Sequence, residues 1–326
     1  MNILVTGAAG FIGSHLTERL VTLGHSVQGL DCMTDYYARA LKELNADAIR
    51  NKGVEFLPLD LATDDLTLAV QAVDVVYHLA AQPGLSDTTT FQTYVRNNLT
   101  ATHRLLEAAK QSTSLQAFVY ISTSSVYGLD ATGSESSEPK PTSHYGVTKL
   151  AAEQLVLAYA RDQGLPACSL RLFSVYGPRE RPEKLYTKLI GCMLDDREFP
   201  LFEGSQDHLR SYTYVDDAVD GLVATLHNWD KCVGEIFNIG TDTAITTGAG
   251  LRIIQDILGK PARFVHKPRR AGDQQKTRAN IAKARRMLGY DPTITPKQGL
   301  AKQVEWYKQH VFEKIDPAGA QESPNY

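Results

Sequence analysis

The sequence has little cysteine, only two tryptophans and no long apolar run. Its four cysteines are far apart and form no C-x-x-C pair; they are Cys32, Cys168, Cys192 and Cys232. We therefore expect buried, reduced thiols rather than a disulfide framework or a zinc site. No stretch approaches the roughly 20 apolar residues of a membrane helix. The opening run "NILVT" is strand-like and lacks the basic region of a signal peptide, so we expect a cytoplasmic protein.

The sequence also has no large excess of positive or negative charge. The chain carries 34 Lys and Arg against 37 Asp and Glu, which gives a net charge of -3, and the two signs are interspersed. A nucleic-acid-binding protein typically shows a basic stripe, and this sequence has none. Its nine histidines show no ligand spacing such as H-E-x-x-H. We therefore expect no nucleic-acid partner and no metal.

Short apolar runs alternate with helix-like segments through the first half of the chain. The runs NILVT, SVQGL, VEFLPL, DVVYHLA, AFVYIS and ACSLRLF lack polar alternation, and helical segments such as 11–23, 94–110 and 145–161 lie between them. This order predicts an α/β protein with a Rossmann-type doubly wound parallel sheet over residues 1–175.

The second half of the chain is less regular. It contains the short strands SYTYV and EIFNIG and four helical segments, 215–226, 250–258, 281–288 and 297–307. We expect residues 176–313 to form mainly a smaller C-terminal α/β lobe, with some of the chain crossing back to the sheet. Residues 314–326 are polar and aperiodic, which predicts a loose tail.

A glycine-rich turn follows the first strand. Gly7, Gly10 and Gly13 stand in "TGAAGFIG", between a strand and a helix, where a dinucleotide-binding turn needs missing side chains. Asp31 ends the second strand, at the spacing of a residue that binds the adenine ribose. Its carboxylate would repel a 2′-phosphate, so the pattern predicts NAD rather than NADP. Asp60 follows the third strand, as a turn residue or as a neighbour of the adenine.

Tyr145 and Lys149 stand four residues apart in "YGVTK", and hence on one face of a helix. A phenol acts as a base near neutral pH only if its pKa of about 10 falls by about three units. A neighbouring ammonium and an oxidised nicotinamide would both lower that pKa. Downstream of a dinucleotide turn, this pair indicates an oxidoreductase-type site.

The sequence resembles the extended short-chain dehydrogenase/reductases that act on nucleotide sugars, over almost its whole length. The matching motifs are TGAAGFIGSHL, HLAAQ, STSSVYG, YGVTK, RLFSVYGPR, RSYTYVDD, EIFNIG and RRAGD. The resemblance implies oxidation of the sugar at C4 by bound NAD, with Tyr145 as base, Lys149 holding Tyr145 and the nicotinamide ribose, and Thr123 bonded to O4. It also nominates further cofactor-binding residues: Phe11, Ile12, Asp60, Leu61, Leu79, Ala80, Ala81 and Ser122.

The stretch "STSSVYG" bears on the reaction type. Related dehydratases carry acids at the two positions after the equivalent of Thr123, and UDP-glucuronate decarboxylases carry Ser-Glu. This chain has Ser124 and Ser125 there, and a hydroxyl cannot replace a carboxyl group as general acid. The resemblance therefore favours a 4-epimerase.

The resemblance also bears on the sugar. Residues 31–45 and "GPRERPE" are similar to UDP-glucuronate 4-epimerases, which nominates Ser124, Ser125, Ser174 and Arg181 as neighbours of a substrate carboxylate. Ser86 departs from that pattern, because those enzymes commonly carry Arg there. The clamp on the diphosphate and ribose of the nucleotide is assigned by resemblance to Arg210, Arg270 and Asp273.

Other readings remain open at this stage. Within the same class, the chain is a candidate UDP-glucose or UDP-N-acetylglucosamine 4-epimerase, followed by a UDP-glucuronate decarboxylase. In a different class, it is a candidate non-catalytic module that senses NAD. Helices 94–110 and 145–161 have broad apolar faces, and in the family such a pair forms an intermolecular four-helix bundle, which predicts a homodimer.

Overall fold

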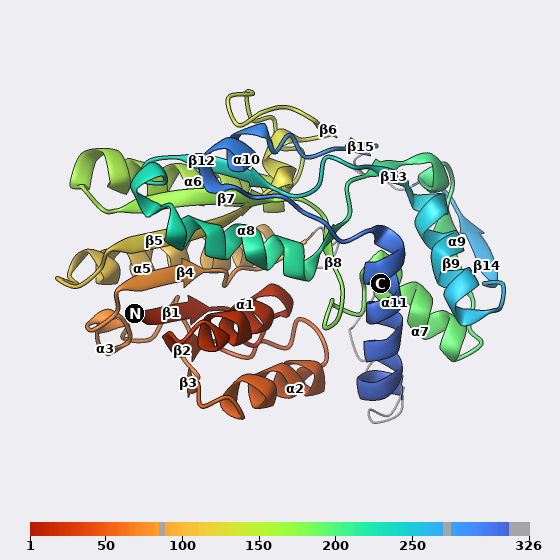
Figure 1. Cartoon of the computed structure of the whole chain (residues 1–326), viewed down its shortest axis with the longest axis horizontal. Coiled ribbons are helices and arrows are strands. Elements are labelled where there is room, and N and C mark those ends of the chain that lie inside the picture. The colour runs from red at the N-terminus through yellow and green to blue at the C-terminus, as the bar shows by residue number, and fades with distance from the viewer. Residues whose placement is uncertain (85–88, 270–274, 313–326) are drawn as a thin grey trace.

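The largest element of the computed structural model is a seven-stranded parallel sheet, in the order β12-β7-β5-β4-β1-β2-β3. The structure describes residues 1–84, 89–269 and 275–312. Helices cover both faces of the sheet (Figure 1). The strands are β1 (Asn2–Thr6), β2 (Ser26–Leu30), β3 (Glu55–Leu57), β4 (Val75–His78), β5 (Ala117–Thr123), β7 (Ala167–Leu172) and β12 (Ile236–Ile239).

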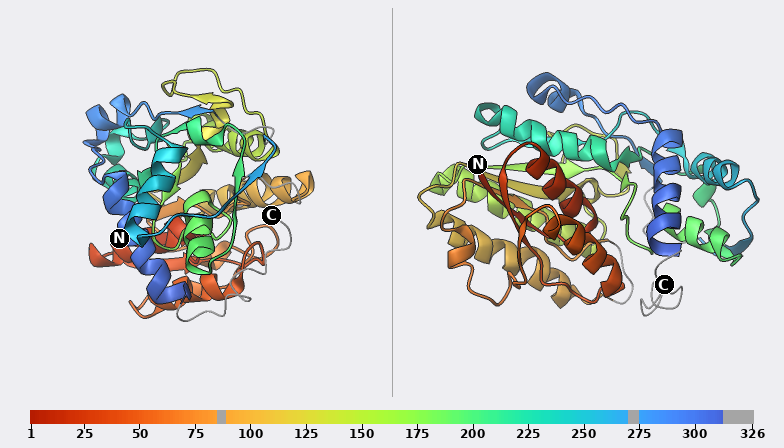
Figure 2. Two further views of the ribbon diagram at one scale, coloured as in Figure 1. Left: turned by 90° about the vertical axis from the view of Figure 1, so that its right-hand side faces the viewer. Right: turned by 60° about the horizontal axis from the view of Figure 1, so that its bottom comes forward.

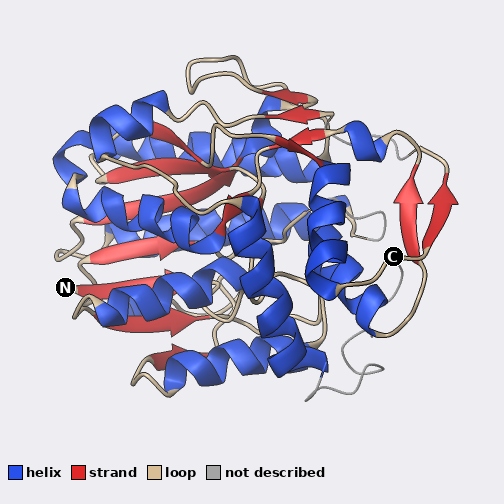
Figure 3. Cartoon of the chain, turned by 45° about the vertical axis from the view of Figure 1, so that its right-hand side comes forward, coloured by secondary structure: helices blue, strands red, loops and turns tan. Residues whose placement is uncertain are grey.

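This strand order confirms the Rossmann-type doubly wound sheet that the sequence predicts. The order reverses between β1 and β4, which pair in parallel, and ligands of such sheets bind outside the carboxyl ends of the strands at this switch point. Figure 3 shows those carboxyl ends pointing towards the C-terminal lobe. The strands have apolar residues on both faces because both faces are covered, and all seven residues of β5 are buried.

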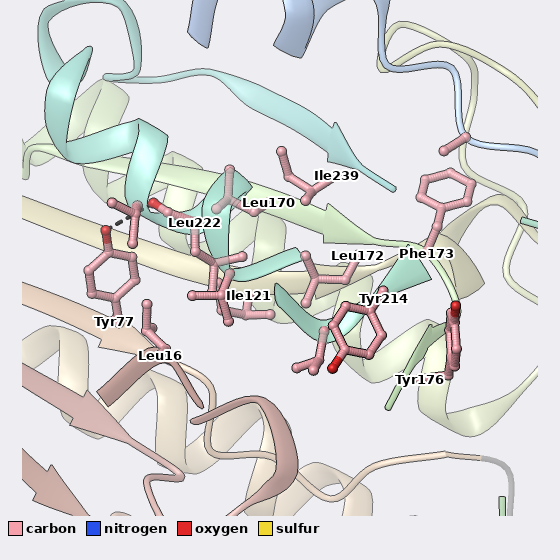
Figure 4. Packing of buried hydrophobic residues seen from close by; sticks show 14 of the residues in the cluster. Leu16, Tyr77, Ile121, Leu170, Leu172, Phe173, Tyr176, Tyr214, Leu222 and Ile239 are labelled. Carbon is pink, nitrogen blue, oxygen red and sulfur yellow. Dashed lines mark hydrogen bonds between the residues drawn. The ribbon is translucent and has the colours of Figure 1, made fainter. Parts of the chain in front are cut away.

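One face of the sheet is packed by α1 (Phe11–Thr22) and α8 (Val215–His227), which contact each other. In the core on this face, Leu16 of α1 and Leu222 of α8 lie near Tyr77 of β4 (Figure 4). The Tyr77 hydroxyl donates to the carbonyl oxygen of Leu222 at 3.0 Å, so the buried phenol has a partner. Further helices are α2 (Arg39–Arg50), which packs on α1, and α10 (Ala282–Leu288), which packs on α8.

The other face is packed by α3 (Thr67–Val70), α5 (Ala101–Lys110) and α6 (His144–Gln163). The Ser143 hydroxyl caps α6 by accepting from the N–H of Gly146, and Gly164 ends it with φ +70°. The predicted helix 94–110 is continuous but not uniform. It consists of α4 (Phe91–Tyr94), a π-helical segment over 95–100, and α5.

The C-terminal lobe lies beyond the carboxyl ends of the strands (Figures 1 and 2). Helix α11 packs on α7 and α9. Its helices are α7 (Leu185–Leu194), α9 (Thr247–Leu258) and α11 (Pro296–Tyr307), and its strands are β6 (Asp130–Ala131), β8 (Val175–Tyr176), β9 (Phe199–Phe202), β10 (Leu209–Arg210), β11 (Thr213–Tyr214), β13 (Ile245–Thr246), β14 (Phe264–Lys267) and β15 (Lys276–Thr277).

The strand in "EIFNIG" is β12, which pairs with β7 in the main sheet because the chain crosses back after α8. One sequence-based expectation needs correction. Cys32 is exposed, whereas Cys168, Cys192 and Cys232 are buried as expected. Within the described residues, no helix is both long and apolar enough to cross a membrane.

Candidate active site

A cavity of about 1090 Å³ lies at the carboxyl ends of the strands and extends into the lobe. It is lined by the turns after β1, β2, β4, β5 and β7 and by residues of α7, β9 and β10. Every predicted cofactor- or substrate-binding residue that the structure describes lines this one cavity. The predicted residues Arg270 and Asp273, and the divergent Ser86, lie outside the described residues.

The glycine turn leaves the start of α1 open to the cavity. Gly7 has φ +72°, and a Cβ there would lie 2.8 Å from the backbone nitrogen of Ala80. A Cβ on Gly13 would lie 2.1 Å from the carbonyl oxygen of Gly7, so both positions require glycine. Gly10 is the N-cap of α1 and caps it with no side chain. The first N–H groups of the helix are therefore available to a pyrophosphate.

Asp31 lines the cavity directly after β2 and is held there by two backbone N–H groups. Its Oδ2 accepts from Ala9 at 3.2 Å, and its Oδ1 accepts from Met33 at 2.8 Å. Burial raises the pKa of Asp31, while the charge of Lys42 and these hydrogen bonds act in the opposite direction. The fixed carboxylate has lone pairs left for ribose hydroxyls.

Asp60 has protein partners of its own. Its Oδ2 accepts from Arg96 at 2.6 Å, and its Oδ1 accepts from the N–H of Ala62 at 2.9 Å. Burial raises the pKa of Asp60, but these bonds outweigh burial and the net shift is downward. Asp60 lines the cavity while it closes its own turn, so both predicted roles fit its position.

Two buried polar atoms on the cavity wall have no hydrogen-bond partner among the described residues. One is the Ser122 hydroxyl and the other is the Gln82 side-chain nitrogen, each on a residue that is almost fully buried. Burying such groups unpaired costs about 1–3 kcal/mol each, which a hydrogen-bonding ligand would recover. With the glycine cradle and Asp31, they form a donor and acceptor set that fits a dinucleotide.

The predicted catalytic residues meet where β5 ends and α6 begins. The Thr123 hydroxyl lies close enough to the Tyr145 phenol to act on its pKa. Thr123 Oγ1 also accepts from the N–H of Ser125 at 3.1 Å. The Lys149 ammonium donates to the carbonyl oxygen of Ile121 at 2.6 Å and lies over the Tyr120 ring. Strand β5 thus orients both Tyr145 and Lys149.

Burial dominates the ionisation of both groups. It raises the pKa of the Tyr145 phenol, while the hydrogen bond from Thr123 and the charge of Arg181 act to lower it. Burial also lowers the pKa of Lys149 to about 7, while the Glu153 carboxylate acts to raise it. The side chains alone therefore do not bring the phenol near neutrality. Bound NAD+ would accept the hydride from C4 and would add a positive charge near the phenol.

Ser124 and Ser125 lie in a 3-10 turn, Ser124–Tyr127, that directly follows Thr123. A buried network holds this turn: the Tyr127 hydroxyl donates to Asn238 at 2.8 Å and accepts from Arg171 at 2.8 Å. Arg171 in turn is paired with the fully buried Glu153. The serine hydroxyls are thus presented to the cavity by rigid backbone.

The guanidinium of Arg181 lies near Tyr145, and its charge acts on that phenol. Its Nη1 is 2.9 Å from a carboxylate oxygen of Glu183, and it lies 5.6 Å from the centroid of the Tyr36 ring. Ser174 also lines the cavity, with a φ of +28° that is unusual for a residue with a side chain. Arg210 lines the cavity from β10.

Several residues of the site were missed at the sequence level. Asn98 links the turn after β4 to the start of α6. Its side chain accepts from the N–H of Gln82 and donates to the Thr148 hydroxyl, which in turn donates to the carbonyl oxygen of Tyr145. Gln82 stands in the family motif HLAAQ, so the sequence could have identified it as a site residue. Lys184 also lines the cavity, and no sequence motif pointed to it.

Comparison with known proteins agrees with this geometry. Residues 3–240 match the family model described as NAD dependent epimerase/dehydratase family. The structure is similar to a UDP-glucuronic acid 4-epimerase from Bacillus cereus in complex with UDP-glucuronic acid and NAD, with a TM-score of 0.90 and 39% identity over 95% of this chain and 99% of that one.

Two curated relatives extend the comparison. A Bacillus subtilis protein named an uncharacterized UDP-glucose epimerase is 39% identical over 94% of this chain and 98% of its own length. UDP-glucuronate 4-epimerase 6 of Arabidopsis thaliana is 34% identical over 94% of this chain and 71% of its own length. The family expected from the motifs is thereby confirmed: the chain belongs to the NAD dependent epimerase/dehydratase family.

Proposed function

We propose that the protein is an NAD-dependent UDP-sugar 4-epimerase that interconverts UDP-glucuronate and UDP-galacturonate. The observation that carries the proposal is the position of the Arg181 guanidinium, close enough to the Tyr145 phenol to act on its pKa, in a cavity whose Thr123 is followed by hydroxyls. An arginine beside the reacting hydroxyl suits a sugar with a carboxylate next to the reacting carbon.

The residues have distinct roles in this reaction. Thr123 holds the C4 hydroxyl, and Tyr145 accepts its proton as C4 is oxidised. Lys149, anchored on the carbonyl of Ile121, positions the phenol and the nicotinamide ribose. After the 4-keto sugar turns over in the cavity, Tyr145 returns its proton to the new C4 hydroxyl, so the phenol is unchanged at the end of the cycle.

Dehydration would need a free carboxyl group beside the sugar. Among the residues that the structure describes, two glutamates line the cavity, and each already has protein partners. Glu183 is paired with Arg181, and Glu180 accepts from Gln303 at 2.9 Å and from Thr187 at 3.2 Å. This arrangement favours epimerisation over loss of water.

Decarboxylation is the hazard of the uronate reaction. Oxidation at C4 makes a β-keto acid, which loses CO2 when the bond to the carboxylate stands perpendicular to the ketone. An epimerase must hold that carboxylate near the plane. The hydroxyls of Ser124, Ser125 and Ser174 and the guanidinium of Arg181 line the cavity and provide the required donors. Bonds to charged groups are worth about 1.5–3 kcal/mol each, enough to bias one torsion.

The proposal includes a division of the chain. Residues 1–175 hold NAD and the catalytic pair, and residues 176–313 mainly hold the UDP-sugar, with Arg210, Arg270 and Asp273 on the nucleotide. It also includes a homodimer formed through a four-helix bundle of the helices over 94–110 and 145–161.

Product analysis tests the function directly. The NAD-loaded protein is incubated separately with UDP-glucuronate, UDP-glucose and UDP-N-acetylglucosamine, and the products are identified by NMR. UDP-galacturonate from UDP-glucuronate is the expected result. Conversion of the neutral sugars alone would establish the galactose-type alternative, a UDP-pentose product would indicate a decarboxylase, and inertness towards all three would favour an NAD sensor.

A further inference from the structure

We propose that Lys184 determines the preference of the cavity for a uronate, by providing the positive charge that pairs with the additional negative charge of that sugar. The inference deepens the proposed function and rests on it. Lys184 directly precedes α7 and lines the cavity together with Arg181 and Arg210.

The charged side chains near Lys184 have partners within the protein, whereas the Lys184 ammonium does not, within the described residues. Arg181 and Glu183 form an ion pair at 2.9 Å, so their charges largely cancel. Glu180 is bonded to Gln303 and Thr187, and burial raises its pKa to about 7, which reduces its negative charge near neutral pH. Within the described part of the chain, the Lys184 ammonium has no hydrogen bond or ion pair of its own.

A half-buried ammonium without a partner is costly unless a ligand supplies the opposite charge. Burial lowers the pKa of Lys184 to about 8, with Arg181 and Arg210 adding to the effect and Glu183 and Glu180 opposing it. The group therefore remains largely protonated at neutral pH and is destabilised in the free protein. An anion bound beside it would reverse that cost.

UDP-glucuronate differs from UDP-glucose by one carboxylate at C6. Arg181 would orient the carboxylate near Tyr145 by hydrogen bonding. Because Arg181 is paired with Glu183, the two together add little net charge. Adding Lys184 gives two cations against Glu183 and the substrate carboxylate, which balances the local charge. With a neutral hexose, one positive charge would stay unpaired.

Binding measurements on three variants, compared with their common parent protein, test this role. All are made in a Tyr145→Phe background, so that substrate is bound without turnover, and affinities for UDP-glucuronate, UDP-glucose and UDP are measured by calorimetry at pH 7. Lys184→Met should weaken UDP-glucuronate by about tenfold or more and leave UDP-glucose and UDP within about twofold. Lys184→Arg should retain the uronate preference, and Lys297→Met, an exposed lysine of α11, should have no effect.

The unmodified site provides a second measurement that does not depend on a folded Lys184→Met variant. As the pH rises above about 8, the ratio of affinities for UDP-glucuronate and UDP-glucose should fall, by up to tenfold per unit, because Lys184 loses its proton. Lys184→Arg should show a flat ratio over that range.

Each other outcome overturns the inference. Equal weakening of all three ligands by Lys184→Met would place the ammonium on the diphosphate. Unchanged affinities, or a flat ratio for the unmodified site, would remove Lys184 from substrate recognition. Failure of the proposed function is recognised separately, because the product analysis with intact Tyr145 would then give no UDP-galacturonate from UDP-glucuronate.

Discussion

The Tyr145 phenol and the Lys149 ammonium share a buried site in which burial shifts the two pKa values apart. Burial disfavours the phenolate and raises the pKa of Tyr145, and it disfavours the ammonium and lowers the pKa of Lys149 to about 7. Both shifts favour the neutral forms in the free protein. The positive charge of bound NAD+ would lower the pKa of the phenol and so oppose the effect of burial on Tyr145, but not on Lys149. Tyr145 would therefore become a base only when the hydride acceptor is bound.

Tyr145→Phe should reduce turnover by two to four orders of magnitude, about 10²–10⁴-fold. The substitution removes the proton acceptor and keeps the ring, and general base catalysis contributes a factor of this size. The rate of epimerisation is measured with saturating substrate, and NAD content is measured after denaturation as the control for folding. NAD content should change little. Turnover close to that of the unmodified protein would mean that another group is the base.

Arg181→Ala and Ser125→Glu should both increase loss of CO2 from UDP-glucuronate. The first frees the substrate carboxylate, and the second places a negative charge beside it. Mass spectrometry of the products measures the fraction of UDP-4-keto-pentose and UDP-pentose. Ser125→Ala is the matched control, because it removes the hydroxyl without adding charge and should increase CO2 loss less than Ser125→Glu. An unchanged product ratio in both Arg181→Ala and Ser125→Glu would contradict the assigned carboxylate site.

The site residues that could be identified from the sequence are those that stand in family motifs. Gly7, Tyr145 and Arg181 stand in "TGAAGFIG", "YGVTK" and "GPRERPE", and the structure brings all three to one cavity. Lys184 could not be identified in this way. It belongs to an ordinary charged run, and only the folded chain shows that its neighbours Arg181 and Glu183 pair with each other.

At the scale of elements, the strands were predictable where a buried strand has a continuous apolar run. β1, β2, β5 and β7 lie where the sequence placed them. The place of β12 beside β7 could not be predicted, because an apolar run shows that a strand is buried but does not show against which neighbour. The π-helical segment over 95–100 also went unpredicted. There the side chain of Asn98 turns to Gln82 and Thr148, a tertiary contact that periodicity does not record.

The β1-turn-α1 unit should retain NAD through purification in preference to NADP. Asp31 is fixed by two backbone N–H groups, and its carboxylate would lie beside a 2′-phosphate and repel it. An epimerase also returns the hydride it takes and has no need to exchange the cofactor. Denaturing the purified protein and identifying the released dinucleotide by chromatography tests this, and a preference for NADP(H) would refute the role given to Asp31.

At the scale of the whole molecule, ion pairs join the N-terminal sheet domain to later segments of the chain. Arg179 of the second half donates to Glu18 of α1 at 2.9 Å, and Arg19 of α1 is paired with Asp220 of α8. The former pair is the more protected from solvent. Arg179 lies two residues before Arg181, so the arginine that we propose to contact the substrate is anchored to the domain that carries the glycine turn.

The last prediction concerns assembly. Phe91 and Val147 are large apolar residues that remain 44% and 45% exposed. The centroid of the Phe91 ring lies 5.0 Å from that of His144, which stands one helical turn before Val147 in α6. Paired helices with an uncovered apolar face favour association with a second copy about a two-fold axis. We therefore expect light scattering at micromolar concentration to give twice the 35.9 kDa chain mass.

Val147→Glu should shift that assembly towards the monomer, because it would bury two like charges near a two-fold axis. Val233→Glu is the matched control: Val233 is equally apolar and 47% exposed, but it lies in the turn before β12, far along the chain from both helices. It should leave the mass unchanged. A monomeric unmodified protein would rule out the helix-bundle dimer, and equal effects of the two substitutions would mean that the contact lies elsewhere.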